Sequence, residues 1–161
     1  MKIAFTGVHG SGKTTIVNRI ERGYRDMNIP YIPVSEVARD CPHPLNTFEG
    51  QRWIWYEQYR REVEAMSTGC DVICDRCLMD NLVYFLYIIE DQGMGSNAQE
   101  SFAFFHSVTK VWMKSYDRVI RMPLNTEWII NDTEDTLRSK DVEYAKTIDS
   151  MFDDMLEEFI K

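Results

Sequence analysis

The chain of 161 residues is 44% hydrophobic and 12% aromatic, a size and composition that predict one folded domain, residues 1–161, and exclude a disordered tail. It has no apolar run long enough to cross a bilayer and no apolar segment followed by a cleavage site at its start, so we expect a cytoplasmic protein without a membrane span. Its formal net charge of −8 argues against binding along a nucleic-acid backbone.

The first half of the chain predicts two strands and two helices. An apolar strand, KIAFT, runs into a glycine-rich turn, and a helix follows in which apolar residues recur at helical spacing. The segment IPYIPVSEVA predicts a second buried strand with prolines near its ends. Thr47 is expected to cap a helix that Gly69 ends. The residues predicted to share one face of that helix are Phe48, Trp55, Tyr56, Tyr59, Val63 and Met66.

The second half continues the alternation of strands and helices. CDVICD predicts a third strand, and NLVYFLYIIEDQG predicts an apolar helix that ends at Gly93. SNAQ, starting at Ser96, has the capping-box pattern and opens another helix. YDRVIRM predicts a fourth strand, and a polar stretch then leads to a last amphipathic helix. Its apolar side carries Val142, Ala145, Ile148, Phe152, Met155, Leu156 and Phe159. This order predicts a three-layer α/β fold with a mainly parallel sheet of about four to five strands flanked by helices.

The glycine-rich turn GVHGSGKT, residues 7–14, fits the pattern G-x-x-x-x-G-K-[ST] and lies between a predicted strand and a predicted helix. Its glycines let successive backbone N–H groups point at phosphate oxygens, and the start of the helix adds positive field. Lys13 should neutralise the β- and γ-phosphates of ATP, and the Thr14 hydroxyl should ligate Mg²⁺. His9 is expected to supply its backbone N–H. The predicted nucleotide contacts are Gly7, His9, Gly10, Ser11, Gly12, Lys13, Thr14 and Thr15.

Acidic and basic side chains follow the ends of the predicted strands, where ligands bind in open α/β sheets. A carboxylate there can hold Mg²⁺ or accept a proton from an attacking hydroxyl. Arginines can clamp an acceptor or the transferring phosphoryl group. The D-x-x-G and N-K-x-D strings of a GTPase do not occur. The side chains concerned are Glu36, Arg39, Asp75, Arg76, Asp80 and Arg138.

The segment VICDRCLMD raises the alternative that Cys74 and Cys77 form a metal or redox knuckle around Asp75 and Arg76. Zinc ribbons pair two short cysteine spacings separated by a loop, whereas here three cysteines crowd together and Cys41 stands apart. Strand alternation should send Cys74 to the face opposite Asp75. The pattern therefore favours the Asp-Arg pair as the functional element, with the thiols in packing.

With these motifs the chain resembles the small P-loop kinases of nucleosides and nucleotides, the deoxynucleoside kinase and thymidylate kinase group. It is most similar to the AAA-domain subset related to bacterial ribosylnicotinamide kinase domains. TGVHGSGKTT resembles the opening of that group, and SEVARD resembles its acid and arginine after the second strand. DRCLMDNLVY is similar to its D-R-x-x-x-D-x-x-x-Y segment, and DTLR resembles its lid arginine.

The resemblance implies a P-loop NTPase fold and a role for each matching residue. Thr14 and Asp75 would hold Mg²⁺, and residues 125–141 would form a lid-like segment. The implied substrate contacts are Glu36, Arg39, Arg76 and Asp80. The implied catalytic residues are Lys13, Glu36 as general base, Asp75, Arg76 and Arg138.

We therefore expect an ATP- and Mg²⁺-dependent phosphotransferase that moves the γ-phosphate to a nucleoside, nucleotide or similar small metabolite. The alternative is a nucleotide-binding regulatory ATPase or switch with little kinase activity. A polynucleotide 5′-kinase is disfavoured by the net charge and by the lack of a basic stripe. The expected partner is a small-molecule acceptor, with nucleic acid disfavoured; a homodimer is compatible with the sequence.

Overall fold

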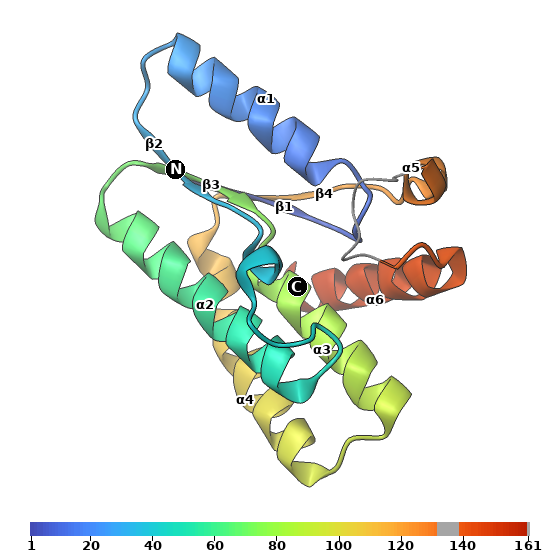
Figure 1. Ribbon diagram of the computed structural model, residues 1–161. Coiled ribbons are helices and arrows are strands. Elements are labelled where there is room, and N and C mark those ends of the chain that lie inside the picture. The colour runs from blue at the N-terminus through green and yellow to red at the C-terminus, as the bar shows by residue number, and fades with distance from the viewer. Residues whose placement is uncertain (132–138, 161) are drawn as a thin grey trace.

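The computed structural model describes residues 1–131 and 139–160 and has the alternating α/β organisation that the sequence predicts (Figure 1). The elements are β1 (Lys2–Thr6), α1 (Lys13–Asp26), β2 (Tyr31–Val34), the 3₁₀ turn η1 (Val37–Asp40), α2 (Phe48–Ser67), β3 (Asp71–Asp75), α3 (Leu78–Gln92), α4 (Ser96–Trp112), the 3₁₀ turn η2 (Met113–Ser115), β4 (Arg118–Arg121), α5 (Thr126–Asn131) and α6 (Val142–Ile160).

The four strands form one parallel sheet in the order β2-β3-β1-β4. Phe5 pairs with Asp75 on one side and with Ile120 on the other, so the carboxyl ends of β3, β1 and β4 meet at one edge. Helix α1 covers one face of the sheet, and α2, α3, α4 and α6 lie on the other (Figure 1). The predicted three-layer parallel fold is confirmed, and the edge where the strands end is the place where a ligand can reach them.

Strand alternation divides the hydrophobic core between the two faces. Ala4 and Cys74 point into the large cluster beneath the sheet, whereas Phe5 and Ile73 pack toward α1. The predicted apolar side of α6 also joins the large cluster, where Phe152 is fully buried. The alternation leaves Asp75 on the opposite face from Cys74, as predicted from the strand pattern. No helix in the described part of the chain is both long and apolar enough to cross a bilayer.

The predicted core face of α2 is wrong in part. Tyr56, Val63 and Met66 are exposed, with 49%, 41% and 40% of their surface accessible. The face that packs against the sheet instead includes Gln58 and Glu62, which are 1% and 0% exposed. Their burial is tolerated because both side chains find polar partners inside the protein, which a reading of apolar spacing alone cannot anticipate.

Three boundaries also differ from the prediction. Ser96 is the first residue of α4, not its N-cap; the N-cap is Gly95, and no side-chain capping bond forms there. Strand β2 stops at Val34, and the following residues turn into η1 because the chain must leave the sheet edge. Part of the polar stretch after β4 is helical, as α5. By contrast, Thr47 caps α2 as predicted, accepting a hydrogen bond from the backbone N–H of Gly50 at 3.1 Å.

Candidate active site

The glycine-rich turn joins β1 to α1 at the carboxyl edge of the sheet. Gly12 caps α1 with φ of +80°, a left-handed conformation that glycine adopts without strain. Gly7 has φ of +141°, and a Cβ atom built there would lie 2.8 Å from the carbonyl oxygen of Met122 at the end of β4. The sequence motif therefore reflects both the curl of the turn and its close approach to a neighbouring strand end.

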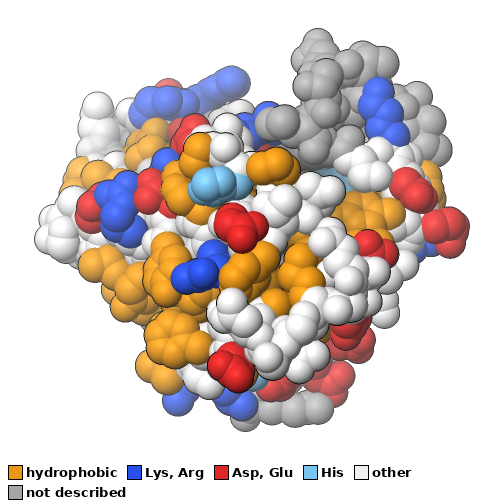
Figure 2. All heavy atoms as spheres, turned by 60° about the horizontal axis from the view of Figure 1, so that its bottom comes forward, with side chains coloured by type: hydrophobic (Ala, Val, Ile, Leu, Met, Phe, Trp, Pro, Cys, Tyr) orange, Lys and Arg blue, Asp and Glu red, His pale blue; other side chains and the backbone are white. Residues whose placement is uncertain are grey.

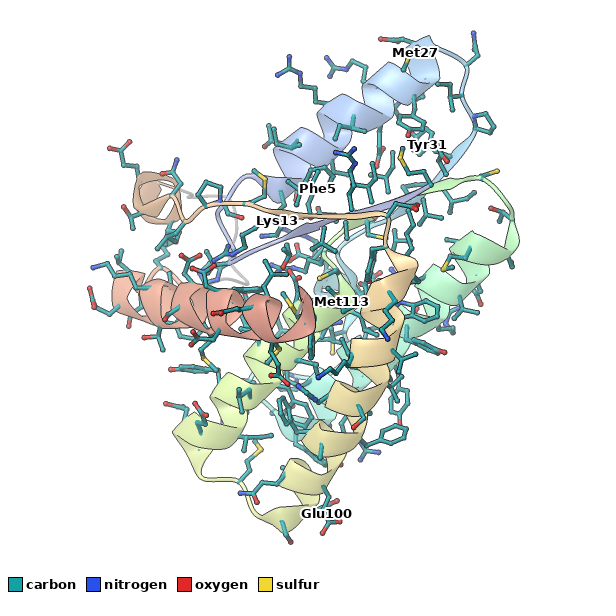
Figure 3. The ribbon with its side chains drawn as sticks, turned by 180° about the vertical axis from the view of Figure 1, so that it is seen from behind. Phe5, Lys13, Met27, Tyr31, Glu100 and Met113 are labelled. Atoms are coloured by element: carbon teal, nitrogen blue, oxygen red, sulfur yellow. The ribbon has the colours of Figure 1, made fainter. Side chains whose placement is uncertain are left out.

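Lys13, the lysine of the motif, is folded back onto its own loop. Its Nζ donates to the carbonyl oxygens of Gly7 at 2.8 Å and Val8 at 2.6 Å, and to the Ser11 hydroxyl at 3.0 Å. Figure 3 shows Lys13 at the start of α1, close to Phe5 near the end of β1. Burial, followed by repulsion from the Arg76 guanidinium, lowers the pKa of Lys13 to about 7 against the opposing effect of nearby carboxylates. The ammonium thus lies within the loop where phosphate oxygens would replace the carbonyls.

Thr14 and Asp75 place two side-chain oxygen groups next to each other beside the loop. The Thr14 hydroxyl donates to Asp75 Oδ2 at 2.6 Å, joining the first turn of α1 to the end of β3. A hydroxyl and a carboxylate are hard oxygen donors, the kind that Mg²⁺ binds together with water and substrate phosphates. This donor set fits Mg²⁺. Among the described residues there is no cluster of three His, Cys, Asp or Glu side chains that would make a site for another metal.

Arg76 is the centre of a buried charged cluster between the glycine-rich loop and strand β2. Its Nε donates to Glu36 Oε1 at 2.8 Å, and its Nη1 donates to Asp80 Oδ2 at 3.1 Å and to the carbonyl oxygen of Gly7 at 3.2 Å. The guanidinium also lies 5.5 Å from the centre of the Tyr84 ring. The Arg76 side chain thus contacts the glycine-rich loop, Glu36 after β2, and helix α3.

Asp80 lies behind Arg76 and has no exposed surface. Its Oδ1 accepts hydrogen bonds from the Thr6 hydroxyl at 2.6 Å, the Cys77 backbone N–H at 3.3 Å and the Cys77 thiol at 3.1 Å. Because its described bonds go to protein groups and it does not line the neighbouring cavity, its geometry suits it to hold Arg76 and the start of α3 in place.

A cavity of about 450 Å³ opens next to this cluster, between η1, α2, α3 and the start of α6. Glu36 and Arg76 form its inner wall. Arg39, half exposed, also lines it and donates to Glu36 Oε2 at 3.0 Å. The rest of the wall is largely aromatic, aliphatic and amide side chains, among them Ile54, Gln51, Asn81, Tyr84, Tyr87, Ile88 and Tyr144. The predicted Glu36, Arg39 and Arg76 are therefore brought together at one cavity.

His9 connects the glycine-rich loop to the chain that follows residue 138. Its backbone N–H donates to the Tyr84 hydroxyl at 3.2 Å, and its Nε2 lies 2.9 Å from the carbonyl oxygen of Ser139. The His9 ring stacks on Tyr144 with 5.8 Å between ring centres. His9 therefore borders the cavity as well as the loop. Arg138 and the rest of residues 132–138, the middle of the predicted lid, lie outside the described residues.

Asn81 is a cavity residue that the sequence analysis did not identify. It is 5% exposed and lines the cavity, and its amide Nδ2 has no hydrogen-bond partner among the residues that the structure describes. An unpaired buried donor is uncommon and costly, so it marks a place where a ligand group can supply the missing acceptor. The signal in the sequence is helical spacing: Asn81, Tyr84 and Ile88 lie on one face of α3.

Thr15, Cys74 and Cys77 do not line the cavity. Thr15 is exposed on the first turn of α1, next to the loop. Cys74 and Cys77 are fully buried and belong to the large hydrophobic cluster, and all four cysteines are free. Burial raises the pKa of both thiols, which keeps them protonated and unreactive. The thiols are therefore part of the core packing around the Asp-Arg pair.

Comparison with known proteins identifies the family and supports the fold. A protein-family model described as an AAA domain matches residues 2–160. The chain is similar in structure to deoxyadenosine kinase from M. mycoides with the products dCMP and a flexible dCDP bound, with a TM-score of 0.75, 20% identity, and coverage of 99% of this chain and 85% of that one.

Two further structures of the same enzyme are similar. The form with bound dATP gives a TM-score of 0.73 at 21% identity, covering 99% of this chain and 86% of that one. The form with bound dCTP gives 0.70 at 20% identity, covering 99% and 85%. No curated protein sequence matches the chain. The chain belongs to the AAA-domain family and has the P-loop fold seen in a nucleoside kinase.

Proposed function

We propose that the chain is an ATP- and Mg²⁺-dependent phosphotransferase that moves the γ-phosphate of ATP to a hydroxyl group of a nucleoside or similar small metabolite. The observation that carries this proposal is the position of Arg76, which contacts the glycine-rich loop through Gly7 and the cavity acid Glu36 at the same time. A phosphate-binding loop and a cavity for a second molecule thus meet at one guanidinium. This is the arrangement that transfer between two bound substrates requires.

On the phosphate side, the loop N–H groups and Lys13 bind the triphosphate, with Lys13 leaving the carbonyl oxygens of Gly7 and Val8 for phosphate oxygens. Thr14 and Asp75 would hold Mg²⁺, which would supply positive charge to neutralise the phosphates. Arg76 stabilises the negative charge that spreads over the equatorial oxygens during transfer. Catalysis on this side is therefore positioning and charge neutralisation.

On the acceptor side, Glu36 accepts the proton of the attacking hydroxyl. The acceptor oxygen forms a bond to the γ-phosphorus, the bond to the β,γ-bridging oxygen breaks, and ADP leaves with that electron pair. Arg39 is placed to contact the acceptor or the transferring group from the cavity rim. Asp80 acts through Arg76 and not by direct contact, which revises the role that the family resemblance implied.

The charges that line the cavity favour an uncharged acceptor. Among its described lining residues, the carboxylates of Glu36, Asp91 and Asp141 stand against the guanidinium groups of Arg39 and Arg76. Arg76 and Arg39 are already paired with Glu36. A monophosphate would bring a dianion to a wall with no surplus of positive charge, whereas a hydroxyl and the uncharged ring of a nucleoside fit the amide and aromatic surfaces.

The test is a panel of nucleosides and nucleoside monophosphates incubated with ATP and Mg²⁺, with ADP formation followed for the wild-type protein and for Lys13→Ala. We expect at least one nucleoside to raise ADP formation well above the rate with water, and Lys13→Ala to abolish the increase. If no acceptor raises ADP formation while ATP is still bound or slowly hydrolysed, the protein is a nucleotide-binding switch. If Lys13→Ala changes neither ATP affinity nor turnover, the phosphate site itself is wrongly assigned.

A further inference from the structure

A second buried charged cluster lies on the inner side of α2, away from the cavity. At its centre is Glu62, which has no exposed surface. Four donors reach its carboxylate: Lys2 Nζ at 2.7 Å, Trp112 Nε1 at 2.7 Å, the Tyr116 hydroxyl at 2.7 Å and Gln58 Nε2 at 2.7 Å. We call these five residues the Glu62 cluster.

The Glu62 cluster is complete without a ligand. The Lys2 ammonium lies 4.3 Å and 4.0 Å from the ring centres of Trp112 and Tyr116 and donates to Ser115 at 2.8 Å. None of the five side chains lines the cavity. Burying an ion pair costs free energy that its own attraction often fails to recover, so a buried pair with this many partners calls for a reason other than stability.

Two of its members contact the backbone at Arg76 and just after it. Gln58 Nε2 donates to the carbonyl oxygen of Arg76 at 3.3 Å, and the Tyr116 hydroxyl accepts from the Leu78 N–H at 2.9 Å. Arg76 itself has φ of +110°, a conformation that a non-glycine residue adopts only when its surroundings hold it there. The peptide group that follows this strained residue is thus tied through Gln58, and the next peptide group through Tyr116, to one buried carboxylate.

We infer that Gln58 and Tyr116 are positioning residues that fix the backbone of Arg76, with Glu62 and Lys2 as their anchor. The inference rests on the proposed function, because it assigns the cluster to the guanidinium that joins the loop to the cavity. The hydrogen bond that Gln58 donates and the one that Tyr116 accepts keep the turn between β3 and α3 in the one conformation that points Arg76 at both Gly7 and Glu36. The cluster acts on transfer only through Arg76.

The experiment compares Tyr116→Phe and Gln58→Met with Thr109→Val. The control removes a buried hydrogen bond of similar length, from Trp55 Nε1 to the Thr109 hydroxyl at 2.9 Å, which does not reach the turn. We expect all three variants to unfold at lower urea concentration. We expect only Tyr116→Phe and Gln58→Met to lower kcat, by about 10- to 100-fold, with KM for ATP within about twofold of wild type. Loss of stability alone would leave kcat per folded molecule unchanged.

A second readout does not depend on turnover. The Nε–H resonance of Arg76, assigned from its loss in Arg76→Lys, reports the hydrogen bond to Glu36 in ¹⁵N-labelled protein. It should shift or broaden in Tyr116→Phe and Gln58→Met and stay in place in Thr109→Val. An unchanged resonance and unchanged kcat in both variants would overturn the inference. A wild-type protein that phosphorylates no acceptor would overturn the proposed function, and the resonance would still decide whether the cluster positions Arg76.

Discussion

Two clusters of buried charge lie on the two sides of the short connection between β3 and α3, and they differ in what they face. In one, Arg76 bridges Glu36 and Asp80 at 2.8 Å and 3.1 Å; in the other, Lys2 pairs with Glu62 at 2.7 Å. Every partner is almost fully buried in both. The first cluster borders a cavity and the phosphate loop, whereas no residue of the second lines that cavity.

Burial and pairing do not by themselves mark a catalytic site. What separates the clusters is access, because only the first can meet a ligand. The face shown in Figure 2 carries single basic side chains scattered among acidic and hydrophobic ones, so access for small molecules is better supported than a surface for a polyanion. Matched substitutions in the two clusters should therefore differ in their main effect. In the first cluster the main effect should be on turnover, and in the second it should be on stability, with any change in turnover passing through the position of Arg76.

The largest effect is expected for Glu36→Gln, which removes the proton acceptor from the open cluster and keeps the shape of the side chain. Turnover with the best nucleoside should fall by about 10²- to 10⁴-fold, because general-base catalysis contributes on that order. The measurement is kcat from ADP formation, with the exposed Glu64→Gln as a control that should match wild type. A fall of less than about threefold would show that another group, or no group, takes the proton.

The same substitution in the closed cluster, Glu62→Gln, should act on stability. It leaves the Lys2 ammonium buried without a counter-charge, and breaking a buried pair in this way costs about 3–5 kcal/mol of unfolding free energy. Urea titration at neutral pH measures it. The double variant Lys2→Met/Glu62→Gln should recover much of the loss, because the charge is then gone from both partners while an amide oxygen still accepts hydrogen bonds at position 62. A Glu62→Gln protein as stable as wild type would remove the distinction between the clusters.

The sequence predicts the open cluster far better than the closed one, for a physical reason. The glycine-rich turn and the Asp75-Arg76 pair are local patterns whose positions follow from where strands end. From their spacing, Gln58 and Glu62 are expected on the solvent-exposed face of a helix. They are buried because Lys2 and Tyr116, which are distant in the chain, pack against them. Fold class and phosphate loop are therefore local information, and buried polar pairing is not.

The open cluster also makes nucleotide affinity depend on pH. The pKa of Lys13 is about 7 in the free protein, and bound phosphates favour its charged form, so binding takes up a proton when the free lysine is neutral. Affinity for ATP should be highest below pH 7 and should fall by up to about tenfold per unit as the pH rises above 7. Calorimetry between pH 7 and 9, in buffers of different ionisation enthalpy, measures both affinity and proton uptake. Flat affinity without proton uptake would contradict the prediction.

The smallest expected effect tests whether the wall of the cavity near the open cluster is built for a ligand. Asn81→Leu replaces an amide whose Nδ2 has no partner within the described chain by an apolar group of similar size. Losing an unpaired buried donor should raise the unfolding free energy by about 1 kcal/mol. If the acceptor substrate forms a hydrogen bond with this amide, its loss should raise the KM for the acceptor substrate by up to about tenfold and leave the KM for ATP unchanged. Urea titration and KM values for both substrates separate the two effects, and Asn46→Leu, at the rim of the same cavity, serves as the control. A variant that gains stability and loses affinity for the acceptor substrate would mean that the unpaired amide of Asn81 lowers stability but serves to bind that substrate. A variant that gains stability and keeps its acceptor KM would mean that Asn81 is only an imperfection in the packing of α3.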